Sequence, residues 1–179
     1  MKTLKFVAIG FIGFFVVACI AAMFLPSKIH LDRSVVIQAP VDSIFNEVAD
    51  FHAWTKWSSW HKKDPNIQLS YSGPASGVGA SYSWKSENDQ IGTGKQVTVE
   101  LIPNQYIKNE MYFMDETEPA FGSFKFEQTP EGVKVTQSMD SDAGYNPLHR
   151  IMGKLMGIFI GPEFEKSLAD LKIVCENHN

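Results

Sequence analysis

The longest apolar stretch of this 179-residue chain lies near its beginning. The 20 residues from Phe6 to Leu25 include no charged side chain, and Pro26 follows them. A helix of this length spans roughly 30 Å, which is the thickness of the hydrocarbon core of a bilayer. The pattern predicts a membrane anchor over residues 1–28 and one domain over residues 29–179.

Flanking charges predict the orientation of this anchor. Lys2, Lys5 and the free amine precede the apolar stretch, whereas Lys28 and Arg33 follow it. Cytoplasmic flanks of membrane helices are enriched in Lys and Arg. By a narrow margin, this bias predicts a single-pass protein with a cytoplasmic N-terminus and the domain on the outer side of the membrane.

Two processed forms are alternatives to an intact anchor. A cleaved signal peptide has a shorter apolar stretch and a cleavage site of small residues, for which the chain offers only weak candidates. Residues 16–19, VVAC, are similar to a bacterial lipobox, in which Cys19 would carry the lipid. Ile20 to Leu25 nevertheless stay apolar beyond this cysteine, as a spanning helix requires, so we expect an uncleaved anchor.

After the anchor, a strand is followed by a short helix. Arg33–Gln38 (RSVVIQ) is rich in β-branched residues and predicts a strand. Pro40 then marks a change of period, because the apolar residues of 41–48 follow the spacing i, i+3, i+4, i+7 of an amphipathic helix.

Residues 51–60, FHAWTKWSSW, hold Trp54, Trp57 and Trp60 at three-residue spacing. This spacing predicts a second short helix, or helical turns, with the three rings on roughly one face. Core packing is the first interpretation, because large aromatic residues dominate protein cores. The alternatives are a pocket rim, for which Trp60 is the best candidate, and a membrane-facing patch.

From Ile67 to Met139 the hydrophobic period becomes two, which predicts an antiparallel meander of about six strands with one apolar face. The residues expected on this face are Val78, Ala80, Tyr82, Trp84, Val97, Val99, Leu101, Ile107, Met111, Phe113, Phe124, Phe126, Val133, Val135, Gln137 and Met139. Gln137 is the polar member of this set. Its buried amide needs a hydrogen-bond partner, which is either a ligand or a neighbouring residue.

A long helical segment ends the chain. Asn146 is a suitable N-cap, and Pro147 suits the first helical position. Gly161 and Pro162 must kink or break the helix. The apolar stripe before this break holds Leu148, Ile151, Met152, Leu155, Met156 and Phe159, and the stripe after it holds Phe164, Leu168, Leu171 and Cys175. Because a helix must bury its stripe, we expect both stripes on the apolar face of the meander.

The charge of the domain argues against one class of partner. All 20 acidic residues, but only 14 of the 16 basic ones, follow the apolar stretch, which gives the domain a net charge of −6. This balance and the lack of a Lys/Arg cluster disfavour nucleic-acid binding. The two cysteines, Cys19 and Cys175, lie in the anchor and near the C-terminus, so no disulfide is expected.

No catalytic motif is visible in the chain. Residues 77–79 (GVG) and 92–94 (GTG) lie among predicted strands, so we expect turns or bulges there and no dinucleotide-binding loop. The five histidines show no metal-ligand spacing, and His61 is expected in a solvated loop. We therefore expect no metal and no cofactor.

The order of the elements and four blocks of sequence resemble one known superfamily. The blocks are RSVVIQAPVDSIFNEVADFHAWTKWSSW, SGPASGVGASYSW, GTGKQVTVELIPNQYI and GPEFEKSLADLK. They resemble the polyketide cyclase/dehydrase-type branch of the SRPBCC, or START/Bet v 1-like, superfamily over nearly all of residues 31–175. The resemblance implies an α+β helix-grip fold. In that fold a curved antiparallel sheet of about seven strands surrounds a long C-terminal helix, and two short helices follow the first strand.

A fold of this kind can leave a deep apolar cavity, so the resemblance also implies a set of lining residues. The candidates are Trp54, Trp57, Trp60, Tyr82, Trp84, Met111, Phe113, Phe124, Gln137, Met139, Met152 and Phe159. The expected partner is an apolar or amphipathic small molecule or lipid. Burial of its apolar surface would hold it, and one or two polar groups such as Gln137 or Tyr82 would orient it.

Three functions are open for such a domain, because this fold supports many functions. The first is a membrane-anchored carrier or sensor of a hydrophobic ligand, and the lack of a catalytic motif favours it. The second is a polyketide cyclase/dehydrase-like enzyme, which requires titratable residues inside the cavity. The third is a ligand-free protein-interaction module at the membrane, which requires a large exposed apolar patch in place of a cavity.

Overall fold

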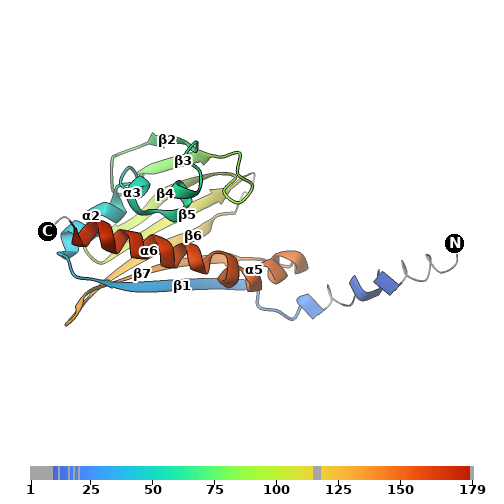
Figure 1. The fold of residues 1–179 in the computed structure, drawn as a ribbon. Coiled ribbons are helices and arrows are strands. Elements are labelled where there is room, and N and C mark those ends of the chain that lie inside the picture. The colour runs from blue at the N-terminus through green and yellow to red at the C-terminus, as the bar shows by residue number, and fades with distance from the viewer. Residues whose placement is uncertain are drawn as a thin grey trace.

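A curved antiparallel sheet of seven strands wraps around the C-terminal helix (Figure 1). The computed structural model describes residues 10–11, 13–15, 17, 19, 21–114 and 118–177. The strands are β1 (Lys28–Ile37), β2 (Gln68–Ser72), β3 (Ser81–Lys85), β4 (Thr93–Ile102), β5 (Tyr106–Phe113), β6 (Ala120–Thr129) and β7 (Gly132–Asp142). The helices are α2 (Val41–Ala49), α3 (Trp54–Trp57), α4 (Ser59–Lys63), α5 (Pro147–Phe159) and α6 (Gly161–Glu176). This architecture confirms the predicted α+β helix-grip fold.

The strand order is β1-β7-β6-β5-β4-β3-β2. Strands β2 to β7 therefore form a meander, and β1 pairs with its last strand, β7. β1 pairs with β7 in antiparallel register, from Lys28 opposite Asp142 to Ile37 opposite Val133. Helices α2, α3 and α4 lie between β1 and β2 in sequence. Three short helices therefore follow the first strand where two were expected, because the extended backbone at Ser58 separates α3 from α4. The first and last strands of the chain therefore pair at one edge of the sheet.

The core lies between the sheet and α6. The stripe of α6 is buried as predicted, at Phe164, Leu168, Leu171 and Cys175. The predicted period of α2 is confirmed as well, because its buried residues include Ile44, Phe45 and Val48. Fully burying one such aliphatic or aromatic side chain stabilises the fold by roughly 1.5–3 kcal/mol.

Strand β4 corrects the predicted alternation. We expected Val97 and Val99 on the apolar face, but Gln96 and Thr98 are the buried residues and the two valines are only half-buried on the other side. The ladder between β4 and β5 shifts register directly after Thr98. Such a bulge inserts one extra residue, which reverses the faces beyond it. Leu101, after the bulge, therefore packs against the core as predicted.

The loop between β2 and β3 corrects a second position. Gly73 and Gly79 have φ angles of 80° and 89°, in the left-handed region that favours glycine. A Cβ on Gly73 would come within 2.2 Å of the carbonyl oxygen of Gly79, so the two backbones are in direct contact. β3 begins only after this tight loop, at Ser81. Val78 consequently lies in the loop and is exposed, whereas we expected it on the apolar face.

Helix α5 does not lay its stripe on the sheet, which corrects a third prediction. Leu148, Met152 and Phe159 are each more than half exposed. The backbone of α5 lies on the beginning of β1, because a Cβ on Gly153 would come within 2.3 Å of Cδ1 of Ile29. β1 is an edge strand, so a helix seated there has little sheet to cover. The predicted break is confirmed, since α5 ends before α6 begins anew at Gly161.

The predicted membrane anchor falls partly outside the described residues, which omit residues 1–9, 12, 16, 18 and 20. Within the described part of the chain, no helix has both the length and the apolarity that a membrane span requires. From Ser27 onward the chain enters the domain, where the Ser27 carbonyl accepts a hydrogen bond from the Ala143 amide at 2.9 Å.

Candidate ligand-binding cavity

A cavity of about 480 Å³ lies among α3, α4, α5, α6 and strands β3 to β7. All of the candidates proposed from the sequence line it: Trp54, Trp57, Trp60, Tyr82, Trp84, Met111, Phe113, Phe124, Gln137, Met139, Met152 and Phe159. The helix-grip arrangement therefore brings together side chains from both ends of the domain. Their role in binding a ligand stays a prediction.

Trp54 and Trp57 line the cavity and are also core residues. Trp54 is 6% exposed and Trp57 is 1% exposed. Nε1 of Trp54 donates to the carbonyl of Val48 at 2.9 Å, and Nε1 of Trp57 donates to that of Glu47 at 3.1 Å. Both rings also pack edgewise against Phe124 of β6, with centroid distances of 5.8 and 6.1 Å. The end of α2 and the sheet thus fix the two indoles from two directions.

Trp60 borders the cavity from α4 and is only half-buried. Nζ of Lys63 lies 4.8 Å from the centroid of its ring. The same ammonium pairs with the carboxylate of Glu163 at 2.9 Å. A cation is attracted to the face of an indole, so Lys63 holds this ring between α4 and α6. This position agrees with the rim interpretation, although a role in ligand entry stays a prediction.

Tyr82 and Trp84 line the cavity from β3, and both are buried. The indole of Trp84 lies flat against the backbone of Gly94 on β4, because a Cβ there would come within 2.3 Å of its Cζ2 atom. Nε1 of Trp84 donates to the carbonyl of Ile91 at 3.3 Å. Burial raises the pKa of Tyr82 far above its ordinary value, so its phenol stays protonated.

His61 is a cavity residue that the sequence reasoning missed. We expected it in a solvated loop, but it is only 8% exposed and its ring centroid lies 5.8 Å from that of Tyr82. Neither Nδ1 nor Nε2 has a hydrogen-bond partner among the described residues. Burial lowers the pKa of His61 to about 4, so the ring is neutral at neutral pH. A spacing of four from Trp57 and seven from Trp54 is the helical signal that could have placed it inward.

A pair of serines fixes the helix that carries His61. The amide of Ser59 donates to Oγ of Ser167 at 3.0 Å, and the two hydroxyl groups are also 3.0 Å apart. Oγ of Ser59 donates to the carbonyl of Glu163 at 3.1 Å. Both serines are buried. These hydrogen bonds tie the first turn of α4 to α6, which holds the His61 ring toward the cavity.

Further buried amides surround the cavity. Gln137 lines it from β7, in agreement with its predicted parity, and its Oε1 is buried without a partner in the described structure. Gln96 of β4 also lines it, but its parity had suggested the outer face. Asn109 of β5 is fully buried opposite Gly122, and its amide oxygen and nitrogen are both unpaired within the described residues. Each unpaired buried polar atom costs about 1–3 kcal/mol. A ligand in the cavity recovers this cost where it pairs with Gln137, whereas Asn109 does not belong to the described lining.

The described lining carries almost no formal charge. No carboxylate belongs to it, and its ammonium, on Lys63, is paired with Glu163 outside the lining. Within the described residues, no three side chains of His, Cys, Asp or Glu cluster closely enough to hold a metal ion. The cavity is therefore apolar with neutral polar groups. This chemistry suits an uncharged molecule that has one or two hydroxyl or amide groups.

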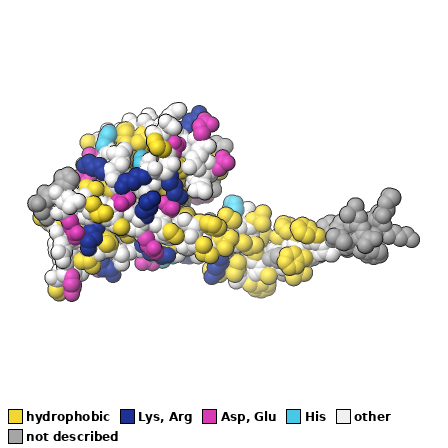
Figure 2. Space-filling model, in the orientation of Figure 1, with side chains coloured by type: hydrophobic (Ala, Val, Ile, Leu, Met, Phe, Trp, Pro, Cys, Tyr) yellow, Lys and Arg dark blue, Asp and Glu magenta, His cyan; other side chains and the backbone are white. Residues whose placement is uncertain are grey.

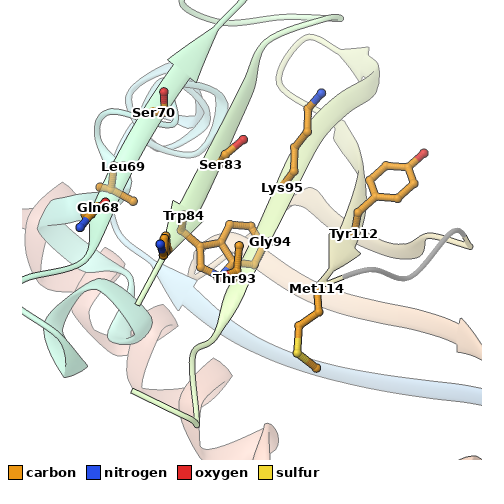
Figure 3. Close-up of a pocket in the computed structure, with 11 residues that line it drawn as sticks. Gln68, Leu69, Ser70, Ser83, Trp84, Thr93, Gly94, Lys95, Tyr112 and Met114 are labelled. Atoms are coloured by element: carbon orange, nitrogen blue, oxygen red, sulfur yellow. The ribbon is translucent and has the colours of Figure 1, made fainter. Parts of the chain in front are cut away.

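A second hollow lies over β2 to β5, and it differs in kind (Figure 3). Ser70, Ser83, Lys95 and Tyr112 form a row across these strands, because each is the register partner of the next. Their side chains project to one side of the sheet (Figure 3). The inner cavity is lined by Tyr82 and Trp84 of β3, whereas Ser83, which lies between them, projects to the opposite face of the strand. The polar row is open to solvent, which makes the inner cavity the better ligand site.

Residues 28–176 match the family described as polyketide cyclase / dehydrase and lipid transport. The match covers most of the chain, and the protein belongs to this family. The family membership confirms the superfamily that the sequence blocks suggested. Among curated proteins, no sequence gives a significant match.

Several solved structures are similar in fold. The di-domain ARO/CYC StfQ from the steffimycin biosynthetic pathway has a TM-score of 0.62 at 14% identity, over 84% of this chain and 51% of that one. A protein from Chromobacterium violaceum has a TM-score of 0.57 at 15% identity, over 84% and 99% of the two chains. A protein of unknown function from Staphylococcus aureus has a TM-score of 0.60 at 10% identity, over 82% and 95%. At such identities the likeness concerns the fold alone.

Proposed function

We propose that this protein is a membrane-anchored binding domain for an uncharged, mostly apolar small molecule or lipid, which it carries or senses. The observation that carries the proposal is the cavity, whose walls are aromatic and aliphatic and whose buried polar atoms on His61 and Gln137 have no partner in the described structure. Its volume of about 480 Å³ falls within the usual range for small-molecule sites. Membership of a family described by cyclase, dehydrase and lipid-transport functions supports the same conclusion.

The polar groups define the end of the ligand that they would recognise. A neutral imidazole offers one donor and one acceptor, and the Oε1 of Gln137 offers an acceptor. A hydroxyl or amide group on the ligand satisfies such a set, whereas a carboxylate or phosphate meets no free cation in the described lining. The preferred ligand is therefore a neutral amphiphile with a hydrogen-bonding end, and a charged lipid headgroup is disfavoured.

The membrane part of the proposal rests on the sequence. The apolar residues Phe6 to Leu25 have the length of a bilayer span, and the flanking lysines favour a cytoplasmic N-terminus. The domain would then lie on the outer side. Lipidation at Cys19 is the alternative anchor. Mass measurement of the protein isolated from its membrane distinguishes the two, because a lipoprotein loses the residues that precede Cys19 and gains acyl chains.

Native mass spectrometry of the full chain, released from its membrane in mild detergent, tests the ligand part. We expect a bound neutral species at one copy per chain. Gly122→Leu is the matched variant, because Gly122 lines the cavity and the nearest atom to a Cβ there is the flexible end of Met111, at 3.2 Å. The larger side chain should fill the cavity and remove the bound species. A wild-type protein that is reproducibly empty contradicts the proposal.

A cyclase- or dehydrase-like enzyme is the second candidate, and the burial of His61 favours it. An unpaired, neutral imidazole inside an apolar cavity can accept a proton from a bound substrate and return it to another atom. Two di-domain ARO/CYC proteins share the fold, which shows only that the scaffold accommodates such chemistry. The species bound to wild type and to His61→Gln separates the two functions. An enzyme accumulates a different bound compound in the variant, whereas a carrier holds the same compound more weakly.

A further inference from the structure

Helix α5 exposes an apolar surface that the domain does not cover. Leu148 is 51%, Met152 57% and Phe159 64% exposed, and Ile158, about 100° away from Phe159 around the helix, is exposed as well. Figure 2 shows hydrophobic side chains gathered over this end of the molecule and continuing onto the N-terminal segment. Contiguous exposed apolar patches are uncommon on soluble monomers and mark interaction surfaces.

The N-terminal segment leaves the domain directly beside α5 (Figure 1). Arg150 of α5 joins the two, because its guanidinium donates to the backbone carbonyls of Met23 and Leu25. In this segment Phe24 and Phe14 are also largely exposed. The exposed face of α5 is therefore continuous with the end of the apolar stretch that we assign to the anchor.

The charge of α5 suits a lipid surface. The helix has no acidic residue, and it carries His149, Arg150 and Lys154, although the domain as a whole has a net charge of −6. Helices that lie in a membrane interface combine an apolar face with basic residues on the other side. Anionic headgroups attract nearby Lys and Arg side chains.

The same helix borders the opening of the cavity. Met152 and Phe159 line the cavity and are more than half exposed, so they lie where its interior meets the outside. A mouth with apolar residues at its margin is poorly suited to water and well suited to the acyl region of a bilayer.

We propose that α5 rests on the bilayer beside the anchor, and that the cavity opens through it into the lipid. The ligand then enters from the membrane without crossing water, which identifies it as a membrane-resident neutral amphiphile. This inference rests on the proposed anchor and cavity. The exposed face of α5 is the surface that connects the anchor in the membrane with the opening of the cavity.

Lipid contact is tested with the full chain in vesicles of phosphatidylcholine and phosphatidylglycerol. In a background with Cys19→Ser and Cys175→Ala, single cysteines at Leu148→Cys, at Ile158→Cys and at Glu131→Cys carry an environment-sensitive NBD dye. Glu131 is exposed in the β6–β7 turn, at the other end of β1 from α5, and serves as the control. Lipids spin-labelled near the headgroup should quench the dye at positions 148 and 158 at least threefold more than at position 131.

Two outcomes of this experiment distinguish a failure of the proposed anchor from a failure of the α5 contact. Chains that fail to float with the vesicles contradict the anchor, and with it the contact of α5. If the chains float but the dye is quenched equally at all three positions, the anchor stands and the contact of α5 with the bilayer is overturned. The native mass spectrum reports on the ligand independently of both.

Entry from the membrane is tested with a pyrene-labelled long-chain alcohol as the ligand probe. The probe is supplied in vesicles, and its uptake is followed by energy transfer from the tryptophans of the cavity. Leu148→Glu combined with Ile158→Glu changes exposed residues that do not line the cavity. We expect uptake from vesicles to slow at least tenfold, while the affinity for the probe added from solvent stays within twofold. An unchanged uptake rate overturns the proposed route.

Discussion

The indole rings of Trp54 and Trp57 lie 4.9 Å apart, and each donates a hydrogen bond to a carbonyl at the end of α2. Replacing either by Ala removes a buried ring and leaves a carbonyl unpaired, so each variant should lose about 3–5 kcal/mol of unfolding free energy. Trp60→Ala should lose much less, because Trp60 is only half-buried. Urea unfolding followed by far-UV circular dichroism measures all three. Equal, large losses would remove the distinction between core and rim.

The burial of His61 predicts a pH dependence of stability. The unfolded chain binds a proton at this residue near pH 6.5, whereas the folded protein binds it only near pH 4. The stability that His61 contributes is therefore complete above about pH 6.5 and is lost as the pH falls to about 4. The full loss amounts to roughly 3 kcal/mol.

The measurement compares wild type with His61→Gln between pH 7.5 and 4, so that other titrating groups cancel. The wild type should lose roughly 3 kcal/mol relative to the variant over this range. His149→Gln, at an exposed position on α5, is the control and should follow the wild type. Parallel curves for wild type and His61→Gln would show that the ring is not desolvated in the folded protein.

We predict that the unpaired amide of Gln137, which would orient a ligand, lowers the stability of the ligand-free protein. Replacing its unpaired amide by Leu removes a buried polar atom, so the ligand-free protein should gain about 1–3 kcal/mol in unfolding free energy. Gln128→Leu, at an exposed position near the end of β6, should change it by less than about 0.5 kcal/mol. Chemical unfolding of ligand-stripped protein measures both. A loss of stability in Gln137→Leu would indicate that a partner within the protein satisfies this amide.

Replacing glycine by alanine should have opposite effects on stability at Gly94 and at Gly157. Gly94→Ala should cost about 1–3 kcal/mol and displace the Trp84 indole, because the new methyl group overlaps Cζ2. Gly157→Ala should gain up to about 1 kcal/mol, because its surroundings are open and alanine favours the helix. Thermal unfolding gives the sign, and near-UV circular dichroism reports the tryptophan. An unperturbed Trp84 spectrum in Gly94→Ala would contradict the contact.

Hydrophobic periodicity predicts this fold well wherever side chains meet one regular surface. Ile44 and Phe45 of α2 and Leu168 and Leu171 of α6 are buried as their spacing requires. The order of strands and helices follows from the same pattern. The resemblance of Trp54 and its neighbours to a known family then supplied the cavity, which periodicity alone does not show.

The predictions that were wrong have local physical causes. A bulge after Thr98 places Gln96 inside, and a two-residue period read from the sequence cannot detect an inserted residue. The second helical segment was predicted to end at Trp60, so His61, which α4 includes, was placed in a solvated loop. The stripe of α5 is largely exposed, because the helix sits on the edge strand β1 through Gly153 and only part of the stripe reaches the cavity. Two of these three cases lie at the cavity and the third at its opening.

Binding of a neutral probe to the cavity tests the central claim most directly. Full-length protein in nanodiscs is titrated with 1-aminoanthracene, and energy transfer from tryptophan reports the bound fraction for wild type and Gly122→Leu. We predict saturable binding of one probe per chain to the wild type and at least tenfold weaker binding to the variant, which should remain folded. Equal binding by the two proteins would contradict a ligand site between the sheet and α6.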